Sequence, residues 1–246
     1  MKKIIAILLV FVLIVPMCII SASADENEEL TFRGIKFGTN YDEVKRRILE
    51  DIGECKIDGT IGGGDNRYYL TLKPDNLKVA GYNVYSIKLL FHFTDVGHNL
   101  KNSIFTQAEY CFRPTPSSSV SSLKDIVTED ITTKLSKLYG DYTKRSNEKK
   151  YYWVKINDNP EVTDSILSNI FLGMDEMSPE NLTKKIDKRV NAEVIYYPYS
   201  RNDFTYSGFE FKIIYASISS ILRAGDLLDN AAAKAIQDSS NNSDGL

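Results

Sequence analysis

Hydrophobic residues recur at helical spacing in three stretches of the chain, and at strand spacing in the stretches between them. Apolar positions four residues apart between 44 and 52 predict an amphipathic helix, which follows a short strand and a turn with two glycines. A longer apolar stripe over 123–138 predicts a second helix, and 221–236 predicts a third, alanine-rich one. The polar stretch 238–246 is expected to form a disordered tail.

The turn that contains Gly34 and Gly38 is expected to dock the first helix onto a sheet. Asn40 stands where the helix would begin and Glu43 follows three residues later, a spacing typical of a capping box. A phosphate-binding loop is the alternative role for these glycines, but the stretch lacks the spacing of a P-loop and of a dinucleotide-binding motif. The sequence therefore favours the structural role.

Alternating apolar residues predict about three strands after the first helix and about three after the second. The longest run, 79–93, places Tyr85 with Ile87 and Leu89 on the face assigned to the core, whereas the glycine-rich stretch 59–66 is expected to be a loop. Short turns between strands favour antiparallel pairing. We therefore expect an α+β fold of two tandem helix-plus-antiparallel-meander units, with a C-terminal helix and tail. The expected bounds are 25–116 and 117–218 for the units and 219–246 for the helix and tail.

Residues 1–24 have the composition of a secretory signal peptide. Lys2 and Lys3 precede an apolar run, and Ala22-Ser23-Ala24 provides small residues for cleavage. Cleavage after Ala24 predicts an exported protein, either secreted or held in the cell envelope. An uncleaved segment that tethers the chain to a membrane is the alternative, because the apolar run is nearly long enough to span a bilayer.

The net charge argues against one class of partner. The 246-residue chain has a net charge of −3, and loss of Lys2 and Lys3 with the signal peptide lowers this by two, to −5. A mildly acidic chain has no general electrostatic attraction to nucleic acid or to an anionic membrane. We expect a monomer that needs no cofactor, binds no nucleic acid, and contacts a membrane only if the signal stays uncleaved.

Two cysteines, Cys55 and Cys111, remain after signal cleavage. In an exported protein such a pair is a candidate disulfide, which would stabilise the fold by roughly 4 kcal/mol in the chain-entropy model. Two thiols that never meet are the equal alternative, because two cysteines carry no spacing signature. The absence of a C-x-x-C motif argues against both thiol exchange and a zinc site.

Catalytic and metal-binding motifs are weak throughout the sequence. His92 and His98 are six residues apart at the end of an expected strand, which is not the spacing of a metal site. Aspartates and glutamates are numerous, so a carboxylate-dependent hydrolase stays open, but no two of them stand out as a catalytic pair. We therefore predict no catalytic residue and no metal ligand.

Tyrosine is the one residue type with a pattern that points to binding. The chain has 15 tyrosines, and several cluster in Tyr151-Tyr152-Trp153 and in Tyr196-Tyr197-Pro198-Tyr199. Exposed Tyr and Trp side chains on a sheet can stack on sugars or anchor a protein partner. The alternative is that tyrosine simply suits strands and is covered by another element. The candidate binding residues are Tyr151, Trp153, Tyr197 and Tyr199.

The phrase FRGIKFGTNYDEVKRRI and the order of expected elements resemble exported bacterial modules of the beta-lactamase-inhibitor-protein type. The helix start Gly38-Thr39-Asn40-Tyr41-Asp42-Glu43-Val44 is also similar to that of small outer-membrane assembly lipoproteins, with Asn40 where that group has Ser or Thr. The resemblance implies a fold and a preference for protein binding, and it assigns no binding residue. Together these features predict a non-enzymatic binding module for a protein or cell-envelope ligand, with the secreted hydrolase as the alternative.

Overall fold

A computed structural model describes residues 30–62, 66–113, 120–144, 150–156, 190–202 and 207–243 of the chain. The expected signal peptide therefore lies outside the described residues. Within those residues, no helix is both long and apolar enough to span a membrane.

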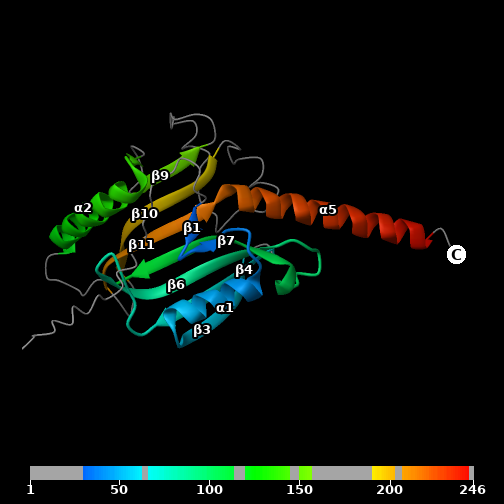
Figure 1. Cartoon of the computed structure of the whole chain (residues 1–246), viewed down its shortest axis with the longest axis horizontal. Coiled ribbons are helices and arrows are strands. Elements are labelled where there is room, and N and C mark those ends of the chain that lie inside the picture. Colours follow the sequence, from blue (N-terminus) through cyan, green and yellow to red (C-terminus); the bar gives the residue numbers. More distant parts are fainter. Residues whose placement is uncertain are drawn as a thin grey trace, which may run out of the picture.

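One antiparallel sheet organises the described residues, and its eight main strands follow the order β3-β4-β6-β7-β11-β10-β9-β8 (Figure 1). A short strand, β5, pairs with β6 outside this order, and β1 and β2 form a separate hairpin. The helices are α1 (Tyr41–Ile52), α2 (Val120–Tyr139) and α5 (Ile218–Ser243), and η1 (Leu100–Asn102) is a single 3-10 turn. The strands are β1 (Thr31–Phe32), β2 (Ile35–Lys36), β3 (Cys55–Gly62), β4 (Arg67–Pro74), β5 (Lys78–Val79), β6 (Tyr82–Phe93), β7 (Ser103–Phe112), β8 (Thr143–Lys144), β9 (Tyr151–Ile156), β10 (Val190–Asn202) and β11 (Ser207–Ser217).

The expected α+β class with a C-terminal helix is confirmed. A helix precedes each half of the sheet, α1 before β3 to β7 and α2 before β8 to β11, and the halves join where β7 pairs with β11. One hydrophobic cluster runs across this junction, from Ile48 of α1 through Phe112 and Phe211 to Ile131 of α2. The halves thus share one core, and their origin as two tandem units stays a prediction.

The turn before α1 docks that helix onto the sheet through the main chain. Arg33 and Gly34 both have positive φ angles, 52° and 74°, as a two-residue hairpin turn between β1 and β2 requires. Gly38 N–H then donates to the Phe105 carbonyl at 2.7 Å, and Phe105 N–H donates to the Thr39 carbonyl at 2.8 Å. The structural role expected for the glycines is confirmed, because these bonds fasten the start of α1 to β7.

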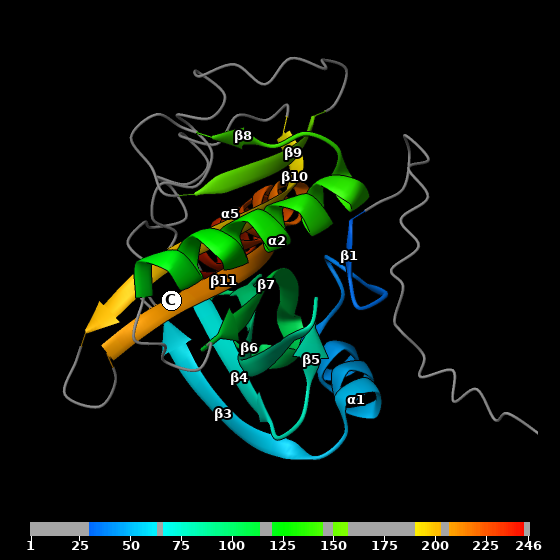
Figure 2. The ribbon, with the colours of Figure 1, turned by 90° about the vertical axis from the view of Figure 1, so that its left-hand side faces the viewer.

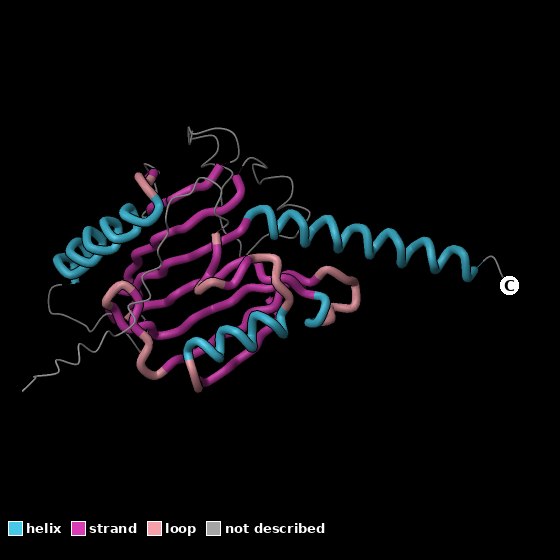
Figure 3. The backbone as a smooth tube through the Cα atoms, viewed as in Figure 1, coloured by secondary structure: helices cyan, strands magenta, loops and turns pink. Residues whose placement is uncertain are grey.

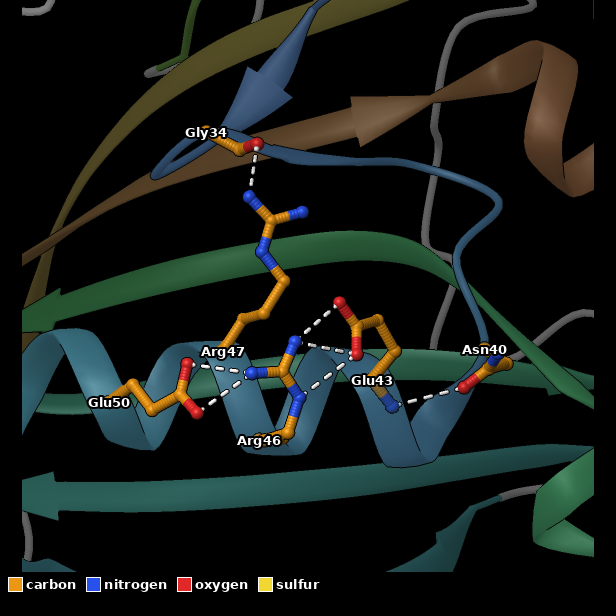
Figure 4. Close-up of polar contacts among 6 residues, drawn as sticks. All are labelled: Gly34, Asn40, Glu43, Arg46, Arg47 and Glu50. Carbon is orange, nitrogen blue, oxygen red and sulfur yellow. Dashed lines mark hydrogen bonds and ion pairs between the residues drawn. The ribbon is translucent and has the colours of Figure 1, made fainter.

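The helix α1 begins at the expected cap. Asn40 Oδ1 accepts a hydrogen bond from the Glu43 backbone N–H at 3.0 Å (Figure 4). The second half of a capping box is not formed, because the Glu43 carboxylate pairs with Arg46, which also contacts Glu50. Arg47 points the other way and donates to the Gly34 carbonyl at 3.2 Å, which ties the helix to the hairpin turn.

Replacing Asn40 with alanine is expected to destabilise the protein by about 1 kcal/mol, because the Glu43 N–H loses its acceptor. Urea unfolding followed by circular dichroism measures this change. Asn40→Asp is the matched control, since its carboxylate can accept the same bond and suits the helix N-terminus. Equal stability of the alanine variant and the wild type would contradict a role for this cap.

The C-terminal helix is longer than the sequence indicates. Its first two turns are buried through Ile218, Ile221 and Ala224, and the rest extends away from the sheet (Figure 3). The expectation of a disordered tail from 238 onward was wrong as far as Ser243, because the helix continues. The Ser239 and Ser240 hydroxyls donate to the carbonyls four residues earlier, so both side chains bond to the main chain of the helix itself.

Candidate functional site

The four aromatic residues expected to form one binding surface lie on two opposite faces of the sheet. Val194 pairs with Trp153, and Tyr196 pairs with Tyr151, so these side chains share the face that α1 and α2 cover, here called the helix face. Residues alternate along a strand, which puts Tyr197 and Tyr199 on the second face. The structure therefore divides the predicted site into two pairs.

Trp153 is a core residue. Its side chain is 3 % exposed, and its indole N–H donates to the Gly140 carbonyl at 3.0 Å, at the end of α2. Tyr142 packs edge-on against it, with 5.6 Å between ring centroids. Tyr151 lies beside it, half-buried, with ring contacts to Tyr142 and Tyr196. These contacts hold α2 against β9 and leave Trp153 no surface for a partner.

Tyr197 and Tyr199 form a stacked pair on the second face, with 5.2 Å between ring centroids. Both are partly buried. Lys150 Nζ lies 5.0 Å from the Tyr197 ring centroid, which is a cation–π contact. Tyr199 Oη donates to Glu210 Oε2 at 2.7 Å, and burial together with this bond raises the pKa of Tyr199 well above its usual value. This pair is the part of the predicted site that stays near the surface.

A chain of polar and aromatic contacts continues from Tyr199 across the sheet to β6. Glu210, 4 % exposed, accepts from Arg113 Nε at 2.6 Å through Oε1. The Arg113 guanidinium in turn lies over the Tyr85 ring, 3.8 Å from its centroid. We call Tyr199, Glu210, Arg113 and Tyr85 the polar track. Its residues come from β10, from β11, from the position after β7 and from β6. The track holds Arg113 in one orientation, with an ion pair on one side and a ring on the other.

Tyr85 is exposed, and its assignment to the core was wrong. Its side chain is 42 % exposed, whereas the neighbouring Val84 is 5 % exposed and belongs to the core. The register of β6 against β7 shifts between Val84 and Ser86, so Tyr85 is an extra residue that pairs with none in β7. Because of this bulge, the Tyr85 side chain is exposed and does not lie on the core face that strand alternation predicts for it.

A hollow of about 370 Å³ opens where the polar track ends. Lys56 of β3, Lys73 of β4, Tyr85 of β6 and Arg113 after β7 line it. Pro74, Asp75, Asn83 and Val84 complete the lining. Three cationic side chains and one carboxylate in a small volume make a site that favours an anionic ligand, with an exposed ring beside it.

Lys56 and Lys73 are directly opposite each other in the β3–β4 register. Like charges at directly opposed positions destabilise a sheet. Ile57 pairs with the core residue Leu72, so alternation puts both lysines on the second face, with Tyr197 and Tyr199. The hollow thus keeps a repulsive pair that an anionic group would relieve.

The candidate disulfide is not formed. Cys55 on β3 and Cys111 on β7 are both free thiols in this structure. Strands β4 and β6 separate them, so three strand spacings of about 4.8 Å put the two residues on the order of 14 Å apart. A disulfide requires roughly 4.4–6.8 Å between Cα atoms, which this sheet does not allow. Burial raises the pKa of the Cys111 thiol, which makes it less reactive.

A second buried ion pair lies beside the polar track. Lys212 Nζ donates to Glu109 Oε2 at 3.0 Å, and both side chains are largely buried. Burial alone would lower the pKa of Lys212, but Glu109 and its neighbours outweigh burial and raise it. Gln107 Nε2 donates to the other Glu109 oxygen at 2.9 Å. These contacts satisfy both oxygens of the Glu109 carboxylate, which is the behaviour of a structural group.

Two further titratable residues are buried away from the hollow. His92 is 6 % exposed, its Nδ1 lies 2.8 Å from the Thr106 hydroxyl, and burial with nearby Arg67 lowers its pKa to about 3. Glu193 is 1 % exposed, and neither of its carboxylate oxygens has a hydrogen-bond partner among the residues that the structure describes. Burial raises the pKa of Glu193 to about 8. Across the described residues, no group of three or more possible metal ligands comes together.

Comparisons with protein-family models, with curated proteins and with solved structures find no match to this chain.

Proposed function

We propose that this protein is a non-enzymatic binding module and that the hollow beside Tyr85 binds an acidic ligand. One observation carries the proposal, the opposed pair of Lys56 and Lys73 in a hollow that Arg113 also lines. Cations held close together at a surface attract an anionic group and lose repulsion when it binds. An exposed tyrosine beside them adds an apolar surface for stacking or packing.

Arg113 is arranged to bind rather than to react. Its guanidinium is held by Glu210 at 2.6 Å and by the Tyr85 ring, so part of its conformational freedom is already lost before a ligand arrives. A planar guanidinium recognises carboxylate and phosphate groups well, because its N–H groups form a fork. An acidic protein segment or an acidic envelope glycan has the required charge.

An acidic protein segment is the ligand we favour, since the resemblance to inhibitor-type modules implies protein binding. The expected signal peptide would bring the protein to the cell envelope or beyond it, and the ligand would be met there. Tyr197 and Tyr199 support the site indirectly, because Tyr199 holds the Glu210 that orients Arg113.

The test is capture from an envelope extract by the tagged protein, with crosslinking and mass spectrometry, beside two variants of the hollow. Lys73→Glu is expected to lose at least about tenfold of the captured ligand, because it reverses one charge in the hollow. Tyr85→Ala is expected to weaken capture less, and raising the salt concentration is expected to weaken capture by the wild type.

Lys101→Glu is the matched control, since it makes the same change in net charge at an exposed position of η1 outside the hollow. Retained capture by this control together with loss in Lys73→Glu would support the hollow as the site. Equal loss in both variants, or no loss in either, would contradict it.

A further inference from the structure

Strand β3 forms an exposed edge of the sheet. It spans the eight residues Cys55–Gly62 and is exposed over its six central residues, and among the described strands it pairs with β4 alone. Figure 2 shows β3 at one outer margin of the sheet, with β4 on its inner side. The opposite margin ends in β8, which has only two residues. An edge of this length presents a row of unpaired main-chain donors and acceptors to another strand.

The side chains of β3 divide cleanly between the two faces of the sheet. Ile57 and Ile61 share the helix face and are 45 % and 55 % exposed, although both are β-branched hydrophobic residues. Lys56 and Asp58 lie on the second face, two residues apart. The edge therefore offers an apolar row on one face and one charge of each sign on the other.

Two glycines let aromatic rings from β4 lie over this edge strand. A Cβ atom at Gly59 would come within 1.8 Å of the Tyr68 hydroxyl, and one at Gly62 would come within 2.1 Å of the Tyr69 ring. Each ring therefore covers a glycine, an arrangement that stabilises strand pairing at glycine positions. These rings hold β3 extended and in register, so its outer edge is formed before any partner binds.

We propose that β3 pairs antiparallel with β3 of a second copy of this chain, about a two-fold axis at Ile57. The charge pattern selects this register. With Ile57 opposite its own symmetry mate, Lys56 of each copy lies opposite Asp58 of the other, and the pairing contains two such contacts. A register shifted by one residue toward the C-terminus would instead put Asp58 opposite itself, and like charges would repel.

The pairing also puts a carboxylate directly opposite Lys56 on its outer side, whereas Lys73 lies directly opposite it in β4. Because the axis is perpendicular to the sheet, the two copies share one continuous sheet and present Lys56 and Lys73 on the same face. Two hollows would then act together on a ligand that carries repeated acidic groups, which raises the overall affinity. This inference goes beyond the proposed function and does not depend on it. It proposes a dimer where the sequence led us to expect a monomer.

A charge swap tests the pairing, with sedimentation velocity of the purified exported protein over a range of concentrations as the measurement. The wild type is expected to dimerise reversibly. Lys56→Asp puts two aspartates opposite each other twice, and Asp58→Lys does the same with two lysines, so each is expected to weaken dimerisation about tenfold or more. The double variant Lys56→Asp/Asp58→Lys is expected to restore the wild-type dimer to within about threefold.

The double variant also controls for folding, because it contains both substitutions and keeps the wild-type net charge. Circular dichroism checks that each single variant keeps the wild-type fold. A wild type that stays monomeric to millimolar concentration, single variants that dimerise as well as the wild type, or a double variant that fails to recover would each overturn the proposal. Loss of ligand capture in Lys73→Glu leaves it standing, since Lys73 lies outside the pairing edge.

Discussion

Replacing Trp153 with alanine is expected to destabilise the protein by about 3–5 kcal/mol, the usual loss for a large aromatic side chain in a packed core. The indole is 3 % exposed, and its N–H donates to the Gly140 carbonyl at 3.0 Å. Alanine would leave a cavity between β9 and α2 and an unpaired carbonyl at the helix end. Urea unfolding followed by circular dichroism is the suitable measurement, because Trp153 is the sole tryptophan and its loss removes the fluorescence signal.

Tyr197→Ala is the matched comparison for Trp153→Ala, because Tyr197 is partly exposed on the second face and forms no part of the core cluster. Its truncation is expected to cost about 1 kcal/mol or less. Similar stability of the Trp153→Ala variant and the wild type would contradict the assignment of Trp153 to the core. It would return this residue to the set of candidate binding residues.

Glu193→Gln is expected to stabilise the protein at pH 7 by about 3 kcal/mol. Each pH unit between the ordinary carboxyl pKa and pH 7 corresponds to about 1.4 kcal/mol. Burial raises the carboxyl pKa of Glu193 to about 8, above its usual value of 4.5. Between these pH values the folded protein keeps a proton that the unfolded chain has released. Stability of the wild type therefore falls as the pH rises through this window, and glutamine removes this loss.

The measurement is the free energy of unfolding of wild type and Glu193→Gln at pH 4.5 and at pH 7. The two proteins are expected to be similar at the lower pH and to diverge at the higher one. Glu109→Gln is the control, because Glu109 is paired with Lys212 and its loss would leave a buried cation without its partner. It is expected to destabilise at pH 7. Parallel curves for wild type and Glu193→Gln would show that Glu193 is not buried as described.

The local features of the first helix were predictable from the sequence, since they depend on residues close together in the chain. The Asn40 cap and the turn at Gly34 and Gly38 need only the local backbone to form. Strand periodicity likewise indicated the antiparallel α+β class. These predictions succeeded because the signal and the structure lie in the same short stretch.

Which residues lie together in the candidate site depends on the register between strands, and the sequence of one strand does not reveal that register. Alternation puts Tyr151 with Trp153 and Tyr197 with Tyr199, but only the pairing of β9 with β10 shows that the two pairs lie on opposite faces. Tyr85 leaves the core because of a bulge against β7. No local signal in the sequence marks that bulge.

Part of strand β3 was wrongly predicted to be a loop, for a similar reason. Glycine is depleted in strands, so Gly59 and Gly62 favoured a turn. The rings of Tyr68 and Tyr69, which lie over these glycines, come from the next strand. The opposed lysines of the hollow, Lys56 and Lys73, became visible only once β3 was paired with β4.

The most direct test of the account is a two-dimensional ¹H–¹⁵N NMR titration of the purified protein with a hexaglutamate peptide as the acidic probe. The predicted result is a set of shifted amides at Lys56, Lys73, Tyr85 and Arg113, with the shifts lost in Lys73→Glu and kept in Lys101→Glu. Shifts spread over the surface, shifts centred elsewhere, or none at millimolar peptide would contradict the hollow as the site of an acidic ligand.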